Sequence, residues 1–165
     1  MKIKHGDLFA YAERTQGPII VHGCNCRGAF AAGFAGLIRN RYPRAYEAYI
    51  NDHDKALLVP GFVRYVPIDN VNNTIIANAC TQYNPGADAT LCSIDACVDH
   101  LINDLSAVAA IMHRKQRRDW DQHVFLPAIG CGIGGLDLKD VQPILERLDV
   151  LEEVGYTINL VLYEG

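Results

Sequence analysis

The sequence predicts an α/β fold whose sheet is largely parallel and covered by helices on both faces. Apolar runs of strand length alternate with longer segments of helical periodicity along the 165 residues. The run Ile19-Ile20-Val21 is continuous and β-branched, which is typical of a strand buried on both faces. Two loops rich in small residues each follow an apolar strand and precede a helix. These observations favour strand–loop–helix units within one sheet.

The first third of the chain predicts two strands followed by two helices. Residues 2–5 are expected to form a short strand, and residues 18–23 form the buried strand. A loop of small residues then leads to a helix at 33–41. Pro43 suits the first turn of a second helix at 44–51, because a residue in the first turn needs no N–H donor.

The middle third predicts two further strands and the longest helix. Residues 61–68 alternate in polarity as a strand does, and residues 74–79 are apolar and follow asparagine-rich turn residues. The sequence YNPGADA, residues 83–89, is expected to be a loop. Apolar residues then recur at helical spacing from Ile94 to Met112, which predicts a long amphipathic helix.

The last third repeats the strand–loop–helix order. A strand is expected at 123–129, the second glycine-rich loop at 130–135, a helix at 138–151 and a final strand at 156–163. The chain has no internal repeat and no low-complexity linker. We therefore expect residues 1–165 to form a single domain, a length that can bury a substantial core.

Composition places the chain among ordinary globular proteins. Hydrophobic residues make up 50% and charged residues 21% of the sequence. No apolar run approaches the ~20 residues that a membrane-spanning helix needs. The first residues lack the apolar core of a signal peptide, so we expect a cytoplasmic protein with no membrane partner. The six cysteines are then expected to be reduced.

A metal site is the weaker interpretation of the cysteine pattern. His22, Cys24 and Cys26 form a conceivable zinc half-site, which Cys131 could complete. Their spacing is not that of the common structural zinc sites. Small buried side chains explain them better, and we expect no metal and no other cofactor.

The charge balance argues against a polynucleotide partner. The net charge is −4, whereas duplex nucleic acid normally requires a basic face. The basic cluster at 113–118 follows a helix, where cations suit the helix dipole. We therefore expect no strong nucleic-acid binding, and the oligomeric state stays open. A small anion is compatible with this charge, because backbone dipoles can bind it without a basic patch.

The two loops are expected at the edge of the sheet where its parallel strands end. Ligands of open α/β sheets bind at this edge. Glycine and alanine let a ligand approach the backbone closely, and the N–H groups of helix N-termini attract phosphate. The second loop, GCGIGG, lacks the Lys-Ser/Thr ending of the nucleotide P-loop. The sequence therefore predicts that two loops hold a phosphate group from two sides.

Four stretches, in this order along the chain, resemble the macrodomain family of ADP-ribose-binding proteins. They are HGDL at 5–8, IVHGCNC at 20–26 with GFA at 33–35, the strand and loop at 76–83, and PAIGCGIGG at 127–135. The motif His-x-Cys-Asn-Cys, together with Arg-Tyr-Pro at 41–43, is most similar to the fungal-type ADP-ribose 1″-phosphate phosphatases. The resemblance implies a three-layer α/β/α fold with a mixed, mostly parallel sheet.

The resemblance also implies which residues form the site. His22 and Asp88 would be catalytic, Asp7 would accept a hydrogen bond from the adenine amino group, and Asn25 would bond the hydroxyl groups of the distal ribose. The expected ligand-binding residues are Asp7, Leu8, Asn25, Gly33, Phe34, Ala35, Gly130, Cys131, Gly132, Ile133 and Gly134. Structural interpretations stay open beside these roles. A lone histidine at the end of a buried strand is often a satisfied core residue, and an asparagine often bonds its own loop.

Two details of the site are less closely specified by the resemblance. Residues 31–33, Ala-Ala-Gly, stand where the family has a run of glycines, a change that narrows or stiffens the first loop. Tyr83, Tyr156 and Tyr163 are all candidates to stack on adenine, and the sequence does not choose among them.

The activity implied by the resemblance is hydrolysis of a phosphoric monoester. The substrate would be ADP-ribose 1″-phosphate, a small-molecule ADP-ribose derivative. A first alternative is an ADP-ribosyl hydrolase acting on modified protein or nucleic acid. One branch of those hydrolases resembles the second loop but uses a lysine after the central strand, and residues 79–84 contain none. A second alternative is a non-catalytic module that only binds ADP-ribose.

Overall fold

The computed structural model describes residues 1–115 and 120–163, and its centre is a six-stranded sheet. The strand order is β1-β6-β5-β2-β4-β3, and only the β3–β4 pair is antiparallel within this described part of the chain. The strands are β1 (Lys2–His5), β2 (Ile19–Cys24), β3 (Val63–Pro67), β4 (Ile75–Cys80), β5 (Gln122–Leu126) and β6 (Tyr156–Leu162). The expected mixed, mostly parallel sheet is confirmed.

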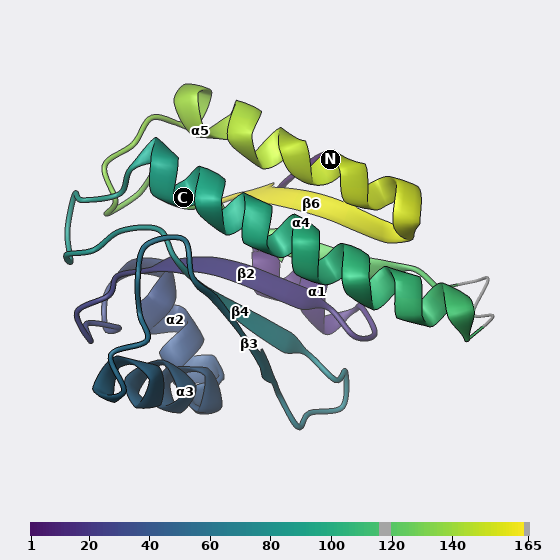
Figure 1. Cartoon of the computed structure of the whole chain (residues 1–165), viewed down its shortest axis with the longest axis horizontal. Helices are drawn as coiled ribbons and strands as arrows, with labels where there is room; N and C mark the ends of the chain where they lie inside the picture. The colour runs from purple at the N-terminus through teal and green to yellow at the C-terminus, as the bar shows by residue number, and fades with distance from the viewer. Residues whose placement is uncertain (116–119, 164–165) are drawn as a thin grey trace.

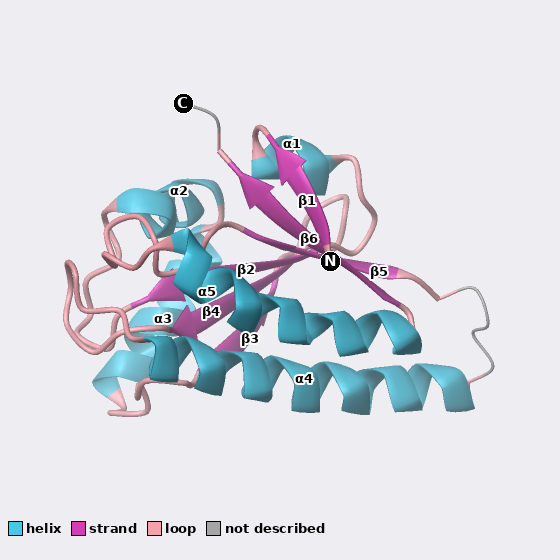
Figure 2. Cartoon of the chain, turned by 90° about the horizontal axis from the view of Figure 1, so that it is seen from above, coloured by secondary structure: helices cyan, strands magenta, loops and turns pink. Residues whose placement is uncertain are grey.

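Helices cover both faces of the sheet, as Figures 1 and 2 show. One face carries α4 (Leu91–Arg114), α5 (Leu138–Leu145) and the 3₁₀ segment η1 (Glu146–Val154), which lie side by side. The other face carries α1 (Leu8–Glu13), α2 (Gly33–Arg41) and α3 (Pro43–Asp54). This arrangement is the three-layer α/β/α fold that the sequence predicts.

The side-chain alternation of β2 shows how two cores form around one sheet. Ile19 and Val21 belong to the core beneath α4, α5 and η1, whereas Ile20 and Cys24 belong to the core beneath α1, α2 and α3. Successive residues of a strand face opposite sides, so a continuous apolar run is what a doubly covered strand requires. Because both faces are buried, the functional groups of this strand are available only at its carboxyl end.

Two elements differ from the sequence predictions. Helix α1 was not expected, since six residues are too few to establish a periodic pattern. The helix expected at 138–151 changes from α to 3₁₀ geometry after Leu145. Leu145, Leu148 and Leu151 are all fully buried at a spacing of three, and a 3₁₀ helix aligns side chains at that spacing on one face.

Helix α4 ends at Arg114, and part of the basic cluster at 113–118 lies outside the described residues. Within the described ranges, every helix is too short or too polar to cross a lipid bilayer.

Candidate functional site

A cleft of about 1190 Å³ opens where the parallel strands end. Both small-residue loops line it, together with the loop between β4 and α4 and the last residues of β6. Ten of the expected site residues line the cleft, namely Asp7, Leu8, Asn25, Gly33, Phe34, Ala35, Gly130, Gly132, Ile133 and Gly134. Three others, His22, Asp88 and Cys131, do not line it. The loops thus meet at one edge of the sheet, as the sequence predicts.

The first loop presents the N-terminus of α2 to the cleft. Gly33 opens this helix with a φ of +55°, a conformation that glycine adopts without strain. The N-cap residue, Ala32, has no side chain able to accept a hydrogen bond. Three N–H groups, those of residues 33–35, therefore have no acceptor within the described chain. Free N–H groups at a helix N-terminus form an anion-binding site.

Side-chain hydrogen bonds hold the preceding part of the first loop. Oδ1 of Asn25 accepts from the N–H groups of Arg27 (2.9 Å) and Ala29 (3.3 Å), while Nδ2 of Asn25 donates to the Ala29 carbonyl oxygen (2.5 Å). The Tyr49 hydroxyl lies 2.9 Å from Asn25 Oδ1 and accepts from the N–H of Gly28 at 2.9 Å. An amide nitrogen carries two N–H donors, so Asn25 keeps one for a ligand while the rest of its amide shapes the loop.

The second loop has its shape from close packing of glycines. A Cβ atom on Gly134 would lie 2.6 Å from the Gly130 carbonyl oxygen and 2.9 Å from the Cβ of Ala89. The Gly134 carbonyl oxygen accepts from the Ala89 N–H at 3.2 Å, which joins this loop to the β4–α4 loop. The N–H groups of residues 132–134 have no acceptor in the part of the chain that the structure describes. They form a second row of free donors along the cleft.

Ile133 connects the two loops across the cleft. Its Cδ1 atom would lie 2.9 Å from a Cβ atom on Gly33, and its side chain is 53% exposed. Glycine is therefore required at position 33 for two reasons: its φ is positive, and a side chain there would collide with Ile133. An apolar side chain lying between two rows of donors can cover a bound group and exclude water from it.

His22 lies beneath the first loop instead of in the cleft. Its side chain is 0% exposed, and its Nε2 lies 2.7 Å from Oδ1 of Asn78. Nδ2 of Asn78 donates to the Ala45 carbonyl oxygen, so Oδ1 faces His22 and accepts from Nε2, while Nδ1 lies 3.2 Å from the Gly23 carbonyl oxygen. Burial lowers the pKa of His22 to about 4, which keeps the ring neutral at pH 7. This geometry gives His22 no direct contact with a molecule in the cleft.

The His22 ring instead supports aromatic residues of the first loop. It meets Phe30 edge-on at a centroid distance of 5.2 Å and Phe34 at 6.4 Å. Phe34 in turn stacks on Phe9 at 5.2 Å, and the Arg41 guanidinium lies 4.5 Å from the Phe9 ring centre. The interpretation of His22 as a satisfied core residue therefore describes its surroundings better than the interpretation as a solvent-accessible acid or base.

Asp88 and Cys131 do not line the cleft either. Oδ2 of Asp88 accepts from the Asn84 N–H at 2.7 Å, so the carboxylate closes the turn of its own loop. The Cys131 N–H donates to the Ala128 carbonyl oxygen at 3.1 Å, and the Cys131 side chain packs against the core beneath α4 and α5. Asp88 is nevertheless close to the site along the chain, since Pro85 and Gly86 of the same loop line the cleft.

The cleft also contains residues that the sequence analysis did not assign to the site. Phe9, Arg41, Thr81 and Gln82 all line it. Phe9 belongs to the unexpected helix α1, whose N-cap is Asp7, with Oδ1 accepting from the Phe9 N–H at 2.9 Å. The Gly-Asp pair before an apolar residue was the available signal for this helix, because aspartate is a preferred N-cap.

The structure distinguishes the three tyrosines that are candidates to stack on adenine. Tyr163 lines the cleft and is 81% exposed, whereas Tyr156 is buried and donates its hydroxyl hydrogen to the Leu105 carbonyl oxygen at 2.9 Å. Tyr83 is half-exposed and lies outside the cleft lining. Only Tyr163 among these three is therefore free to stack on a molecule in the cleft.

One cysteine, Cys24, lines the cleft and lies against a second, fully buried thiol. Sγ of Cys24 lies 3.9 Å from Sγ of Cys80, and hydrogen bonding to Cys80 together with burial raises the pKa of the Cys24 thiol. Cys24 is therefore a protonated thiol at pH 7 and a poor nucleophile. The described histidine, cysteine and acidic side chains form no group of three or more that could hold a metal ion.

The comparison with known families agrees with this geometry. Residues 21–145, which include both loops, match the Macro domain family. The chain belongs to this family. Among curated relatives, the macrodomain is 37% identical to the ADP-ribose 1″-phosphate phosphatase of Debaryomyces hansenii, covering 96% of this chain and 99% of that protein. It is 24% identical to the enzyme of the same name from Lodderomyces elongisporus, with 96% and 99% covered.

Solved structures support the fold. The macrodomain of Mycobacterium tuberculosis DarG has a TM-score of 0.68 at 24% identity, and the match covers 99% of this chain and 97% of that one. Thermosipho africanus DarTG in complex with ADP-ribose has a TM-score of 0.74 at 16% identity, over 98% of this chain and 42% of that one. At these identities the likeness concerns the fold, and the three-layer arrangement of the macrodomain is confirmed.

Proposed function

We propose that this macrodomain binds ADP-ribose derivatives in the cleft and hydrolyses ADP-ribose 1″-phosphate to ADP-ribose and phosphate. The observation that carries the proposal is the pair of free N–H rows, residues 33–35 and 132–134, that line the cleft. The names of the Debaryomyces and Lodderomyces relatives, which match nearly the whole chain, support the phosphatase activity. The ADP-ribose bound to the Thermosipho protein supports the ligand class.

The two donor rows suit the diphosphate of ADP-ribose. Phosphate oxygens accept hydrogen bonds, and a helix N-terminus adds a favourable dipole. In this proposal, Asp7 accepts from the adenine amino group at one end of the cleft, and Tyr163 stacks on the base. At the other end, the remaining N–H donor of Asn25 bonds a hydroxyl group of the distal ribose.

The hydrolysis itself is assigned to the distal end of the cleft. Free backbone N–H groups would stabilise the charge that develops on the transferred phosphoryl group. We keep Asp88 as the group that activates water, because its loop contributes Pro85 and Gly86 to the lining. His22 is reassigned as a positioning residue, since it is buried and neutral and supports Phe30 and Phe34.

A specific observation favours a second candidate, a macrodomain that binds ADP-ribose without turning it over. The side chains lining the cleft beside Asn25 are neutral, and neither expected catalytic side chain is among them. A cleft of this kind can recognise a ribose and a diphosphate without performing acid–base chemistry.

One set of assays separates the candidates. ADP-ribose is titrated by calorimetry, and product release is followed from ADP-ribose 1″-phosphate and from ADP-ribosylated protein in parallel. We expect ADP-ribose to bind, phosphate to be released, and Asp88→Asn to lower kcat by at least about a hundredfold while leaving ADP-ribose affinity within about twofold. Binding without either product would establish the reader, and release of ADP-ribose from protein alone would establish the hydrolase.

A further inference from the structure

The charge of the proposed substrate is not matched by the cleft alone. A terminal phosphate carries about −1.5 to −2 at pH 7, in addition to the diphosphate. Among the described residues that line the cleft, Arg41 is the single cation. Its guanidinium is paired with Glu13 and stacked on Phe9, both on α1. The end of the cleft that contains Asn25 therefore lacks a cation for the terminal phosphate.

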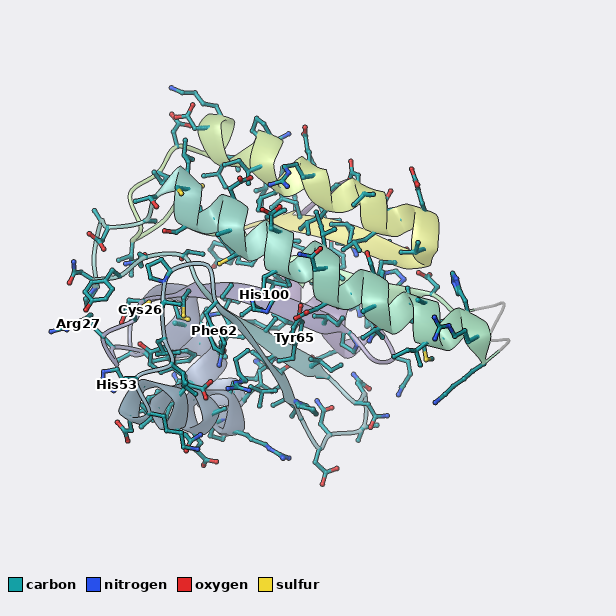
Figure 3. All side chains as sticks on the ribbon, viewed as in Figure 1. Cys26, Arg27, His53, Phe62, Tyr65 and His100 are labelled. Atoms are coloured by element: carbon teal, nitrogen blue, oxygen red, sulfur yellow. The ribbon has the colours of Figure 1, made fainter. Side chains whose placement is uncertain are left out.

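Arg27 is the nearest cation along the chain to this end. It follows Asn25 by two residues, and its N–H donates to Oδ1 of Asn25 at 2.9 Å. The side chain that is proposed to meet the distal ribose thus also fixes the backbone of Arg27. Figure 3 shows Arg27 at the end of the molecule where β2 finishes, away from Phe62, Tyr65 and His100.

The Arg27 side chain is held at this edge by an aromatic residue of the neighbouring loop. Its guanidinium carbon lies 5.6 Å from the ring centre of Tyr83, a cation–π distance. The Cys26 N–H donates to the Tyr83 carbonyl oxygen at 3.0 Å, which ties the two loops together beside this pair. Arg27 is exposed and, within the described chain, forms no ion pair, so its five donors are available.

Both members of this pair flank the cleft lining. Asn25 and Ala29 line the cleft on either side of Arg27 in sequence, and Gln82 and Pro85 do so on either side of Tyr83. The pair therefore joins two loops that both contribute to the cleft, although neither Arg27 nor Tyr83 itself lines it. A guanidinium recognises a phosphate with two parallel hydrogen bonds, which a lysine cannot reproduce.

We propose that Arg27, held by Tyr83, binds the terminal phosphate of ADP-ribose 1″-phosphate and so distinguishes the phosphorylated substrate from ADP-ribose. This inference rests on the proposed phosphatase function and assigns its specificity to one side chain. Arg27 contributes to binding in the ground state and the transition state alike, so its loss acts mainly on KM.

The test compares Arg27→Ala with a matched control. Arg39→Ala removes a similar pair, in which Arg39 lies 4.1 Å from the Tyr46 ring centre outside the cleft lining. For Arg27→Ala we expect KM for ADP-ribose 1″-phosphate to rise about tenfold, kcat to change less than about threefold, and the Kd of ADP-ribose to stay within about twofold. Arg27→Lys should recover part of the loss, and Arg39→Ala should match the wild-type protein.

The outcomes separate this inference from the proposed function. An unchanged KM in Arg27→Ala, or an equal loss of affinity for ADP-ribose, would overturn the assignment of Arg27. If the wild-type protein releases no phosphate, the proposed function fails, and both ligands are then compared by direct titration. In that case the assignment of Arg27 is supported if the wild-type protein binds ADP-ribose 1″-phosphate about tenfold more tightly than ADP-ribose and Arg27→Ala loses this difference. Equal affinities of the wild-type protein for the two ligands would reject the assignment.

Discussion

The two loops present similar rows of free N–H groups but are built in different ways. The first loop is held by side chains, through the Asn25 amide, the Tyr49 hydroxyl and the aromatic contacts of His22. The second loop is held by backbone, with Gly134 packed against Gly130 and Ala89. Removing a side-chain contact leaves the other contacts of the first loop in place. A methyl group added at Gly134 meets a backbone atom, so this position should tolerate less change than the side-chain contacts of the first loop.

Gly134→Ala tests this difference most severely. The new Cβ would lie 2.6 Å from the Gly130 carbonyl oxygen, so the loop must shift and its N–H groups lose their alignment. A hydrogen bond to a charged group contributes about 1.5–3 kcal/mol, so the loss of one or two of them should lower ADP-ribose affinity by about a hundredfold in calorimetric titrations. Gly132→Ala is the comparison within the loop, because its Cβ would meet no atom within 4 Å. Equal affinities for the two variants would contradict the packing argument.

The support of the first loop should depend on pH. Burial lowers the pKa of His22 to about 4 from an ordinary value near 6.5, so between these values the unfolded chain binds a proton that the folded protein does not. The contribution of neutral, buried His22 to the unfolding free energy is therefore present above pH 6.5 and is lost as the pH falls toward 4. We expect His22 to account for about 2 kcal/mol of the decrease in unfolding free energy between pH 7 and pH 5.

Denaturant unfolding of His22→Gln at several pH values measures this contribution. Glutamine can donate to Asn78 but does not titrate, so the variant should lose that share of the pH dependence. His113→Gln, on the exposed end of α4, is the matched substitution outside the first loop. If the unfolding free energy of His22→Gln depends on pH as steeply as that of the wild-type protein, the pKa of His22 is the same in the folded and unfolded states.

Tyr49→Phe should have the smallest effect of the three. It removes the hydroxyl that accepts from Gly28 and contacts Asn25, and leaves the Gly28 N–H without that partner. The expected loss of unfolding free energy is about 1–2 kcal/mol, with ADP-ribose affinity reduced less than in Gly134→Ala. Thermal unfolding of Tyr46→Phe, a half-buried tyrosine on the same helix, is the matched control. Similar melting temperatures for the two variants would mean that the Tyr49 hydroxyl does not hold the loop.

The sequence predicted those features of the fold that follow from the spacing of apolar residues and from the composition of the loops. The continuous apolar run of β2 identified a doubly covered strand, and two small-residue loops identified the edge of the sheet where the cleft lies. Helix α1 and the change to 3₁₀ geometry after Leu145 were not predicted. A six-residue helix has too few turns for a pattern, and the spacing of three in Leu145, Leu148 and Leu151 is close to that of an α-helix.

Side-chain direction was the other feature that the sequence did not specify. Residue type suggested proton transfer for His22, yet the pleat of β2 turns this side chain toward Asn78 and the core beneath α3. Asp88 and Cys131 likewise lie in loops that contribute to the cleft, but their side chains contact the Asn84 N–H and the core instead of lining it. A pattern can locate a loop on the correct edge, but the direction of each side chain depends on tertiary contacts.

The N-cap of helix α2 is Ala32, which lacks the hydroxyl, amide or carboxylate that commonly accepts from the first turn. Such a cap contributes about 1 kcal/mol to a helix, and α2 has none from its own side chains. An anion in the cleft would supply the missing acceptor, so ligand binding and the completion of this helix would be one event. The protein thereby keeps a small, local instability at the place where its ligand can remove it.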